Sequence, residues 1–312
     1  MPKQERRLER CRPQQIWDAL AEFSCVYVPS GPLEWHGRQN PVGLDGLKAT
    51  AICQQAAKRT GGLVFPTIFF GAHEVPWPLG MPVAPDQVQA NTQTVLDYLA
   101  RNGAQVVVWL GGHGGTEDYF AVRRAALNTM RQSDCLVFAA IDQHLILDLE
   151  PSMDHAAAIE TSLLLHLEPK TVDLSELDPS PDQWPEGVGG EDPRQRASAE
   201  RGAHYAETLV DRIAEVACRL VTMDDPVARR KHLQCVAQQV AVDDIVVYGR
   251  AKLASADAPA KAPDESWLQH LQAYRAGNYD DALTAGRATI DAVRLATAGR
   301  RTAGRDDNER VV

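Results

Sequence analysis

The chain has 312 residues, 44% of them hydrophobic, and a formal net charge of −10 at pH 7. Its length and apolar content suffice for one large α/β domain plus an extension. Its acidity argues against binding to nucleic acid, because that binding depends on cationic side chains that neutralise phosphates.

Short apolar segments alternate with amphipathic helical patterns along the first 225 residues. The predicted strands span 25–29, 62–71, 105–112 and 135–142, and the predicted helices span 12–23, 45–61, 84–103, 116–134, 155–167 and 200–221. This alternation predicts an α/β fold in which a mostly parallel sheet is covered by helices on both faces. Polar residues in the connections then gather at one rim of the sheet, where open α/β sheets place their ligands.

The region after residue 225 is expected to be a separate extension. An Ala/Pro-rich linker at 254–263 precedes two helices around a GNY turn within 265–299. The sequence AGNYDDAL resembles a single tetratricopeptide-type hairpin, which cannot bury its own apolar face. We therefore expect a packing or oligomer-contact element, with partner recognition as the alternative, and a flexible tail at 301–312. The predicted domains are thus 1–225 and 226–312.

Targeting signals are not apparent in the sequence. The first residues, MPKQERRLERCR, hold no apolar segment of a signal peptide, and no segment is long enough for a transmembrane helix. The six cysteines are scattered without C-x-x-C spacing, which indicates reduced thiols. These features predict a cytoplasmic protein without a membrane partner.

Polar residues that adjoin the apolar segments predict a metal site. They are Glu34, His36, Asp45, His113 and Glu160. Glu34 and His36 are two residues apart, so in an extended segment their side chains leave the same face. Asp45 follows nine residues later, where a loop could fold back and place a carboxylate between two cations. Imidazole and carboxylate ligands without thiolates suit zinc, manganese or iron rather than a closed structural zinc site.

Each of these residues also has an ordinary structural interpretation. A Glu-x-His pair is common in loops, His113 could simply satisfy backbone carbonyls, and Glu160 could be a surface helix residue. The coincidence of their positions favours one or two divalent cations. Two cations that share a carboxylate would generate hydroxide at neutral pH and polarise a carbonyl, so the pattern predicts a metal-dependent hydrolase.

Four motifs resemble the creatininase (creatinine amidohydrolase) family. In chain order they are GPLEWHGRQNPVGLD, GGHGG, DHAAAIETSLLLHLEP and GVGGEDPRQRASAERG, over roughly residues 25–225. The resemblance implies the creatininase-like α/β fold and amidohydrolase activity on a small molecule. It also implies a homo-oligomer, possibly a ring-like hexamer. The long loop at 176–200, rich in Pro, Gly and acids, would then be folded near the site or near a subunit boundary.

The resemblance also implies roles for individual residues. One metal would be held by Glu34, Asp45 and His113, and the other by His36, Asp45 and Glu160, with Asp45 bridging. Creatinine-cleaving members have a carboxylate two residues after the glycine-flanked histidine, where this chain has Gly115. Glu160 is therefore the first choice for completing the second site, and Glu117 is the alternative.

His155 is the candidate general acid/base, since an imidazole titrates near neutral pH, and Asp154 could orient it. A helix-capping or core histidine is the alternative interpretation of His155. Trp35 and Trp77 could stack on a flat substrate ring, although large aromatic residues more often simply pack. His73 and Glu74 lie in a loop that lines the pocket in the family.

The expected reaction is cleavage of a C–N bond in a small amide, lactam or formamide. The alternative is a hydrolase that opens a C–C bond of a cyclic ketone with the same metal site. A catalytically silent family member that acts as a binding module is a second alternative. The complete ligand set favours an enzyme.

Overall fold

The computed structural model describes residues 5–72, 77–180, 182–251 and 265–306. The predicted linker at 254–263 and the predicted pocket residues His73 and Glu74 lie outside these ranges. The chain divides into two compact units, Met1–Asp224 and Asp225–Val312. No described helix is both long and apolar enough to cross a lipid bilayer.

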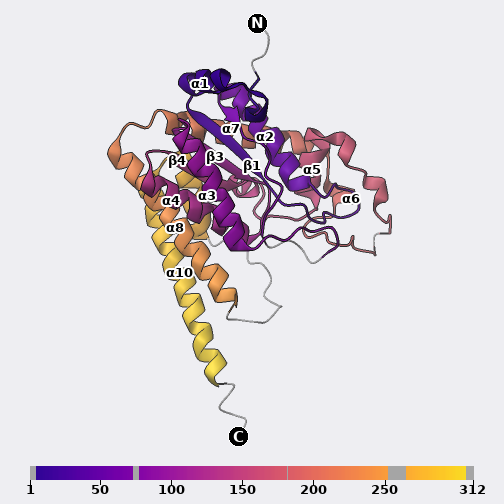
Figure 1. Cartoon of the computed structure of the whole chain (residues 1–312). Helices are drawn as coiled ribbons and strands as arrows, with labels where there is room; N and C mark the ends of the chain where they lie inside the picture. The colour runs from indigo at the N-terminus through magenta and orange to yellow at the C-terminus, as the bar shows by residue number, and fades with distance from the viewer. Residues whose placement is uncertain (1–4, 73–76, 181, 252–264, 307–312) are drawn as a thin grey trace. The chain divides into compact units, whose positions relative to one another are not determined.

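The first unit is built on a parallel sheet, as predicted (Figure 1). Its strands are β1 (Cys25–Ser30), β2 (Leu63–Val64), β3 (Val106–Gly111) and β4 (Leu136–Ile141), in the order β2-β1-β3-β4. Tyr27 of β1 is in register with Val108 of β3, which is in register with Phe138 of β4. These strands are buried along nearly their whole length, as expected for a sheet that is covered on both faces.

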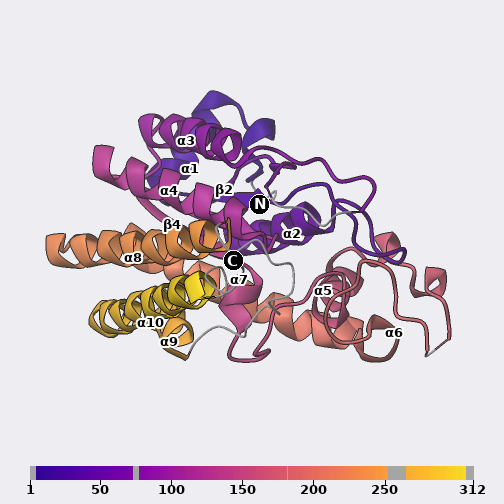
Figure 2. The same ribbon diagram turned by 90° about the horizontal axis from the view of Figure 1, so that it is seen from below.

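Helices lie on both faces of this sheet (Figure 2). They are α1 (Pro13–Glu22), α2 (Leu44–Thr60), α3 (Pro85–Arg101), α4 (Thr116–Gln132), α5 (Ala158–Leu167), α6 (Pro193–Arg196) and α7 (Ala199–Val221), with short 3-10 turns at Leu8–Arg10, Gln143–Ile146, Pro169–Thr171 and Leu174–Glu176. Helix α3 packs on α4, while α2 packs on α7, and α7 packs on α5. This arrangement confirms the predicted fold class.

Two predicted elements are shorter in the structure. The strand expected at 62–71 ends at Val64, because Pro66 has no N–H for a ladder hydrogen bond. The chain then follows β1 only through an isolated bridge between Ser30 and Ile68. The helix expected from His155 begins only at Ala158, because Ala156 has a φ of +55°, outside the helical region.

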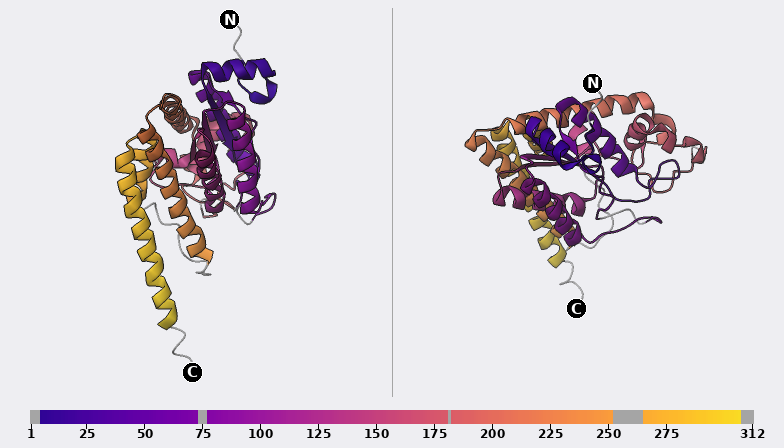
Figure 3. Two further views of the ribbon diagram at one scale, coloured as in Figure 1. Left: turned by 60° about the vertical axis from the view of Figure 1, so that its left-hand side comes forward. Right: turned by 45° about the horizontal axis from the view of Figure 1, so that its top comes forward.

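The second unit is a bundle of helices: α8 (Pro226–Ala251), α9 (Glu265–Ala276) and α10 (Tyr279–Asp306) (Figure 3). The sequence predicted the α9–α10 hairpin but not α8. Helix α10 packs against both α8 and α9, so α8 supplies the partner face that a lone hairpin lacks. Helix α10 also extends through 301–306, which were expected in the flexible tail, because no proline interrupts the helix there.

Candidate metal centre

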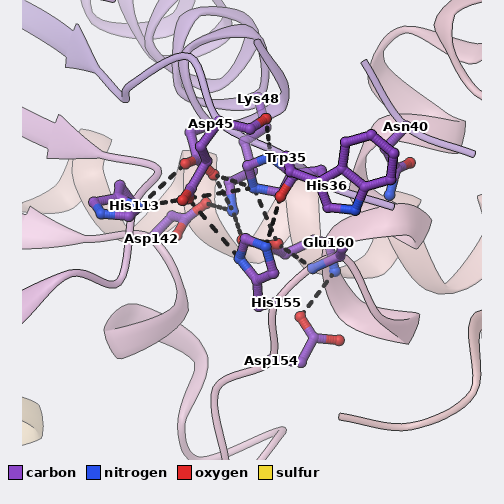
Figure 4. Close-up of polar contacts among 12 residues, drawn as sticks. Trp35, His36, Asn40, Asp45, Lys48, His113, Asp142, Asp154, His155 and Glu160 are labelled. Atoms are coloured by element: carbon purple, nitrogen blue, oxygen red, sulfur yellow. Dashed lines mark hydrogen bonds and ion pairs between the residues drawn. The ribbon is translucent and has the colours of Figure 1, made fainter. Parts of the chain in front are cut away.

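The predicted ligands meet beyond the carboxyl ends of β1, β3 and β4 (Figure 4). Glu34 and His36 lie in the loop after β1, Asp45 in the first turn of α2, His113 after β3 and Glu160 in the first turn of α5. Each of these residues is at most 5% exposed.

The loop after β1 folds back on itself, which returns the chain to the site at Asp45. The backbone N–H of Glu34 donates to the carbonyl of Val42 at 2.9 Å. A Cβ on Gly112 would lie 2.2 Å from the Asp45 carbonyl oxygen. Only glycine permits this close approach between the end of β3 and the start of α2.

The first group of ligand atoms joins Glu34, Asp45 and His113. His113 Nδ1 lies 2.9 Å from Glu34 Oε1 and 3.3 Å from Asp45 Oδ2. His113 Nε2 lies 3.1 Å from the carbonyl oxygen of Ala72, which can only accept, so Nε2 carries the hydrogen. Nδ1 of the neutral ring therefore turns its lone pair toward two carboxylates, and a proton or a metal cation is needed between them.

The second group joins His36, Asp45 and Glu160. His36 Nδ1 donates to the carbonyl of Glu34 at 3.2 Å, which leaves Nε2 facing the site. His36 Nε2 lies 3.2 Å from Asp45 Oδ1 and 3.7 Å from Glu160 Oε2. Asp45 thus contributes one oxygen to each group, as a bridging carboxylate would.

The electrostatics of the two groups show how much negative charge is concentrated there. Burial by itself would lower the pKa of His36, but Asp45, Glu160 and Glu34 raise it to about 9. Burial would likewise lower the pKa of His113, yet the carboxylates of Asp45 and Glu34 raise it well above its usual value. Burial opposes ionisation of Asp45, but His36 and His113 hold the pKa of Asp45 well below its usual value. The cluster therefore favours any cation that can enter.

His155 stands between this cluster and the solvent. Its Nε2 donates to the carbonyl of Trp35 at 2.8 Å, so Nδ1 is the unprotonated nitrogen of the neutral ring. Nδ1 lies 3.9 Å from Glu34 Oε1, and the His155 and His36 rings lie 4.5 Å apart. His155, Glu34 and His36 form a third group of converging ligand atoms. The position suits either a proton carrier or a ligand.

Asp154, the residue predicted to orient His155, directs its carboxylate to helix α5 in the structure. The Asp154 carboxylate accepts hydrogen bonds from the backbone N–H groups of Ile159 at 2.6 Å and Glu160 at 3.3 Å. These groups belong to the first turn of α5, which has no acceptors of its own for them. Burial and the Glu160 carboxylate raise the pKa of Asp154 to about 8. Asp154 therefore caps α5, and the carbonyl of Trp35 holds His155.

The structure brings Glu160, and not Glu117, to His36 and Asp45. Among the described residues, Glu117 belongs to none of the groups of converging ligand atoms. A Cβ on Gly115 would lie 2.3 Å from His113 Nε2 and 2.7 Å from the carbonyl of Ala72. A carboxylate side chain at residue 115 is therefore incompatible with the observed position of His113.

Sequence reasoning missed a buried lysine beside Glu160. Lys48 Nζ lies 2.5 Å from Glu160 Oε1 and 3.2 Å from Asp142 Oδ2, and Gln143 Nε2 donates to the same Glu160 oxygen at 3.0 Å. Asp142 follows directly after β4, just as His113 follows β3. The expectation that ligands gather at the carboxyl ends of the strands could therefore have identified Asp142 as well. Lys48 gave no such signal, because a lysine on a helix is usually exposed.

A cavity of about 440 Å³ opens beside His155. Two tryptophans line it, Trp77 and Trp184, together with the 185–189 segment of the long loop. Trp35 does not line this cavity, and its indole N–H donates to the carbonyl of Glu186 at 3.1 Å. The sequence did not single out Trp184, although it stands in a Pro/Gly-rich loop.

The long loop at 176–200 is folded against the site, one of the two locations expected for it. His155 and Gly189 pair through two backbone hydrogen bonds of 2.7 and 2.9 Å. Arg194 fixes the loop from within, since its guanidinium donates to the carbonyls of Asp178, Ser180 and Gln183 and to the Asp192 carboxylate. This loop thus forms one wall of the cavity beside the metal centre.

Comparison with known proteins identifies the family. The profile of the creatininase family, described as creatinine amidohydrolase, matches residues 9–217. The chain belongs to the creatininase family. It is 29% identical over 185 residues to a creatinine amidohydrolase from Pseudomonas putida, a match that covers 51% of this chain and 70% of the relative. The predicted family is confirmed.

Solved creatininase structures share the fold. A crystal structure of creatinine amidohydrolase (creatininase) has a TM-score of 0.61 at 23% identity, covering 70% of this chain and 99% of the other. A structure described as "Creatininase Mn" has a TM-score of 0.60 at 23% identity, covering 70% of this chain and 100% of the other.

Proposed function

We propose that this creatininase-family protein binds two divalent cations and hydrolyses a C–N bond in a small amide, lactam or formamide. In this proposal Glu34, Asp45 and His113 hold one cation, and His36, Asp45 and Glu160 hold the other. Donors of this kind suit zinc, manganese or iron. One solved structure with the same fold is described as "Creatininase Mn", and manganese is among the metals that this donor set suits.

One observation carries the proposal. Both His36 and His113 donate their outer N–H to a backbone carbonyl, so that in the neutral rings both inner nitrogens face carboxylate oxygens at 2.9 to 3.3 Å. Outer N–H groups fixed in this way are typical of histidines that bind metals, because the bond orients the ring and raises its basicity. Both Asp45 oxygens are buried and accept no hydrogen bond from a described residue. Without a metal, each inner nitrogen would have to carry a proton to face these carboxylates, and divalent cations would take the place of those protons.

The chemistry follows from the same arrangement. Divalent cations held here would supply Lewis acidity and a lowered pKa for water, as in other hydrolases. His155 Nδ1 would take a proton from the attacking water and return it to the leaving nitrogen, while the carbonyl of Trp35 keeps the ring in place. His155 suits this role because it both lines the cavity and faces Glu34.

The cavity supports a small substrate. Its volume of about 440 Å³ and its tryptophans, Trp77 and Trp184, fit a compact and partly flat molecule better than a polymer. The carbonyl to be attacked would lie near His155, and the rest of the molecule would lie between the tryptophans and the 185–189 segment.

A screen of small lactams, formamides, acyclic amides and cyclic ketones tests the proposal. We expect C–N hydrolysis of at least one amide, loss of turnover after removal of metal by a chelator, and recovery after addition of Mn²⁺ or Zn²⁺. Turnover that persists in verified metal-free protein would contradict the proposal. Cleavage of cyclic ketones alone would replace the C–N reaction with the C–C reaction.

A further inference from the structure

Lys48 lies on one side of the metal centre. Its Nζ atom is 2.5 Å from Glu160 Oε1, 3.2 Å from Asp142 Oδ2 and 3.7 Å from Asp45 Oδ1 (Figure 4). The side chain is fully buried, at 0% exposure. Asp45 Oδ1 is the oxygen that faces His36, whereas the other oxygen faces His113. The ammonium therefore lies beside two members of the second group, Glu160 and the Asp45 oxygen that faces His36, whereas of the first group it approaches only the shared Asp45.

The charge of Lys48 is fixed by its surroundings. Its Nζ atom lies within 3.7 Å of three carboxylates, those of Glu160, Asp142 and Asp45, and no position so close to three buried anions favours a neutral amine. The side chain therefore acts as a buried monovalent cation. It lowers the negative potential that would otherwise attract a divalent cation to His36, Asp45 and Glu160.

Glu160 does not depend on Lys48 alone for its position. Its Oε1 also accepts from Gln143 Nε2 at 3.0 Å, and its Oε2 accepts from the backbone N–H of Ala156 at 2.7 Å. The Glu160 carboxylate would therefore keep its orientation if the ammonium were removed. The effect of the Lys48 charge on metal binding can therefore be tested separately from any effect of Lys48 on the position of Glu160.

We infer that Lys48 is a built-in cation that makes the His36–Asp45–Glu160 site the weaker of two metal sites. The inference rests on the proposed function, since it requires both sites to bind metal. The Glu34–Asp45–His113 site then retains its metal tightly, and the second site exchanges its metal more readily. The charge of Lys48, and not its shape, sets the difference in metal affinity between the two sites. Lys48 therefore acts on the metal site electrostatically and does not touch substrate.

Two substitutions with opposite expected signs test the inference. Lys48→Met removes the positive charge and should strengthen binding at the weaker site. Asp142→Asn keeps the side-chain shape and an oxygen that can accept from the N–H of Gln143, as Asp142 Oδ1 does at 2.7 Å. It removes a negative charge beside Lys48, so it should weaken binding at the same site. A purely structural role would make both substitutions weaken binding.

The experiment is a calorimetric titration of the metal-free full chain with Mn²⁺ at pH 8. Metal analysis after dialysis then measures how much Mn²⁺ each variant retains. We expect two unequal binding steps in the native protein, and Glu160→Gln should abolish the weaker one. Lys48→Met should tighten the weaker step, and Asp142→Asn should loosen it, each by about tenfold or more, given the strength of charge interactions across a few ångströms of protein. Lys48→Arg, which keeps the charge, should resemble the native protein.

The outcomes separate this inference from the function on which it rests. Two binding steps that weaken in both variants, or change in neither, would overturn the role of Lys48 and leave the metal centre intact. A native chain that binds no Mn²⁺ would overturn both. Circular dichroism shows whether Lys48→Met folds. If it does not fold, Asp142→Asn and Lys48→Arg still test the inference, because unchanged Mn²⁺ binding in Asp142→Asn would contradict it.

Discussion

At the scale of single residues, His155 occupies the boundary between the cavity and the buried cluster. It is held by backbone groups on two sides: Trp35 through the ring, and Gly189 through the main chain. Its side chain is 24% exposed, whereas the His36 side chain has no exposure. This position, between the cavity and the buried cluster, suits the proton transfer proposed for His155.

His155→Gln should keep the fold and the bound metal but lose turnover by about a hundred- to ten-thousand-fold, the usual contribution of a general acid–base group. Glutamine can still donate to the carbonyl of Trp35 but has no titrating nitrogen. Metal content and kcat, measured on the same preparation, check this. Loss of metal would make His155 a ligand, and near-native kcat would leave it a structural histidine.

The convergence of the proposed ligand residues could be predicted because they adjoin apolar strands or carry recognisable motifs, as with His113 after β3. The buried residues that contact these side chains and change their electrostatic environment could not be predicted. Lys48 and Glu160 are separated by 112 positions, and nothing near Lys48 in the sequence distinguishes it from an exposed helical lysine. Adjacency in sequence suggested that Asp154 contacts His155, whereas in the structure the backbone turns at Ala156 and the Asp154 carboxylate accepts hydrogen bonds from α5.

At the scale of elements, the residues that precede α5 include a strained backbone position, Ala156, next to residues of the candidate site. Ala156 has a φ of +55°, its N–H donates to Glu160, and its carbonyl accepts from Gln39 and Thr161. Non-glycine residues in this region of φ are destabilised, and they persist where the surroundings impose the conformation. Here the turn directly follows His155 and precedes α5, whose first turn carries Glu160.

Ala156→Gly should change the free energy of unfolding little, because relief of about 1–2 kcal/mol of left-handed strain offsets the greater backbone entropy of glycine and the lost methyl group. Ala157→Gly is the matched control, since Ala157 is also fully buried but has a φ of −95°. We expect the control to be less stable than Ala156→Gly by about 1–2 kcal/mol in urea unfolding. Equal losses would show that Ala156 is unstrained.

The strands and helices near the site were predictable because their apolar periodicity is clear. The exceptions have local causes. Pro66 ends β2 early, and α8 mixes apolar and charged residues without a clean stripe, so its length was not evident. Helix boundaries set by tertiary contacts, such as the start of α5 at Ala158, depend on partners that sequence periodicity does not register.

At the scale of the whole molecule, the predicted homo-oligomer remains a prediction. The 176–200 loop carries exposed groups such as Trp184, which is 51% exposed, on the rim of the cavity. We expect light scattering at micromolar concentration to give a mass that is a multiple of the 34.2 kDa chain. A stable monomer would contradict this expectation.

Deleting residues 264–312 should change assembly or solubility more than metal content, because no proposed ligand lies there. The deletion removes α9 and α10 and exposes the face of α8 that packs on α10. Light scattering and metal analysis on the same sample separate the two effects. Loss of metal with unchanged assembly would show that the second unit supports the site.

Asp45 is proposed to be shared by two metal cations, and metal analysis of the purified chain tests this proposal most directly. We expect close to two equivalents of a divalent transition metal after purification in its presence. Asp45→Asn should reduce this content far more than Glu117→Gln, because both Asp45 oxygens face imidazole nitrogens of the centre whereas Glu117 joins no group of converging ligand atoms among the described residues. Native protein without stoichiometric metal, or metal lost from Glu117→Gln but kept in Asp45→Asn, would contradict the account.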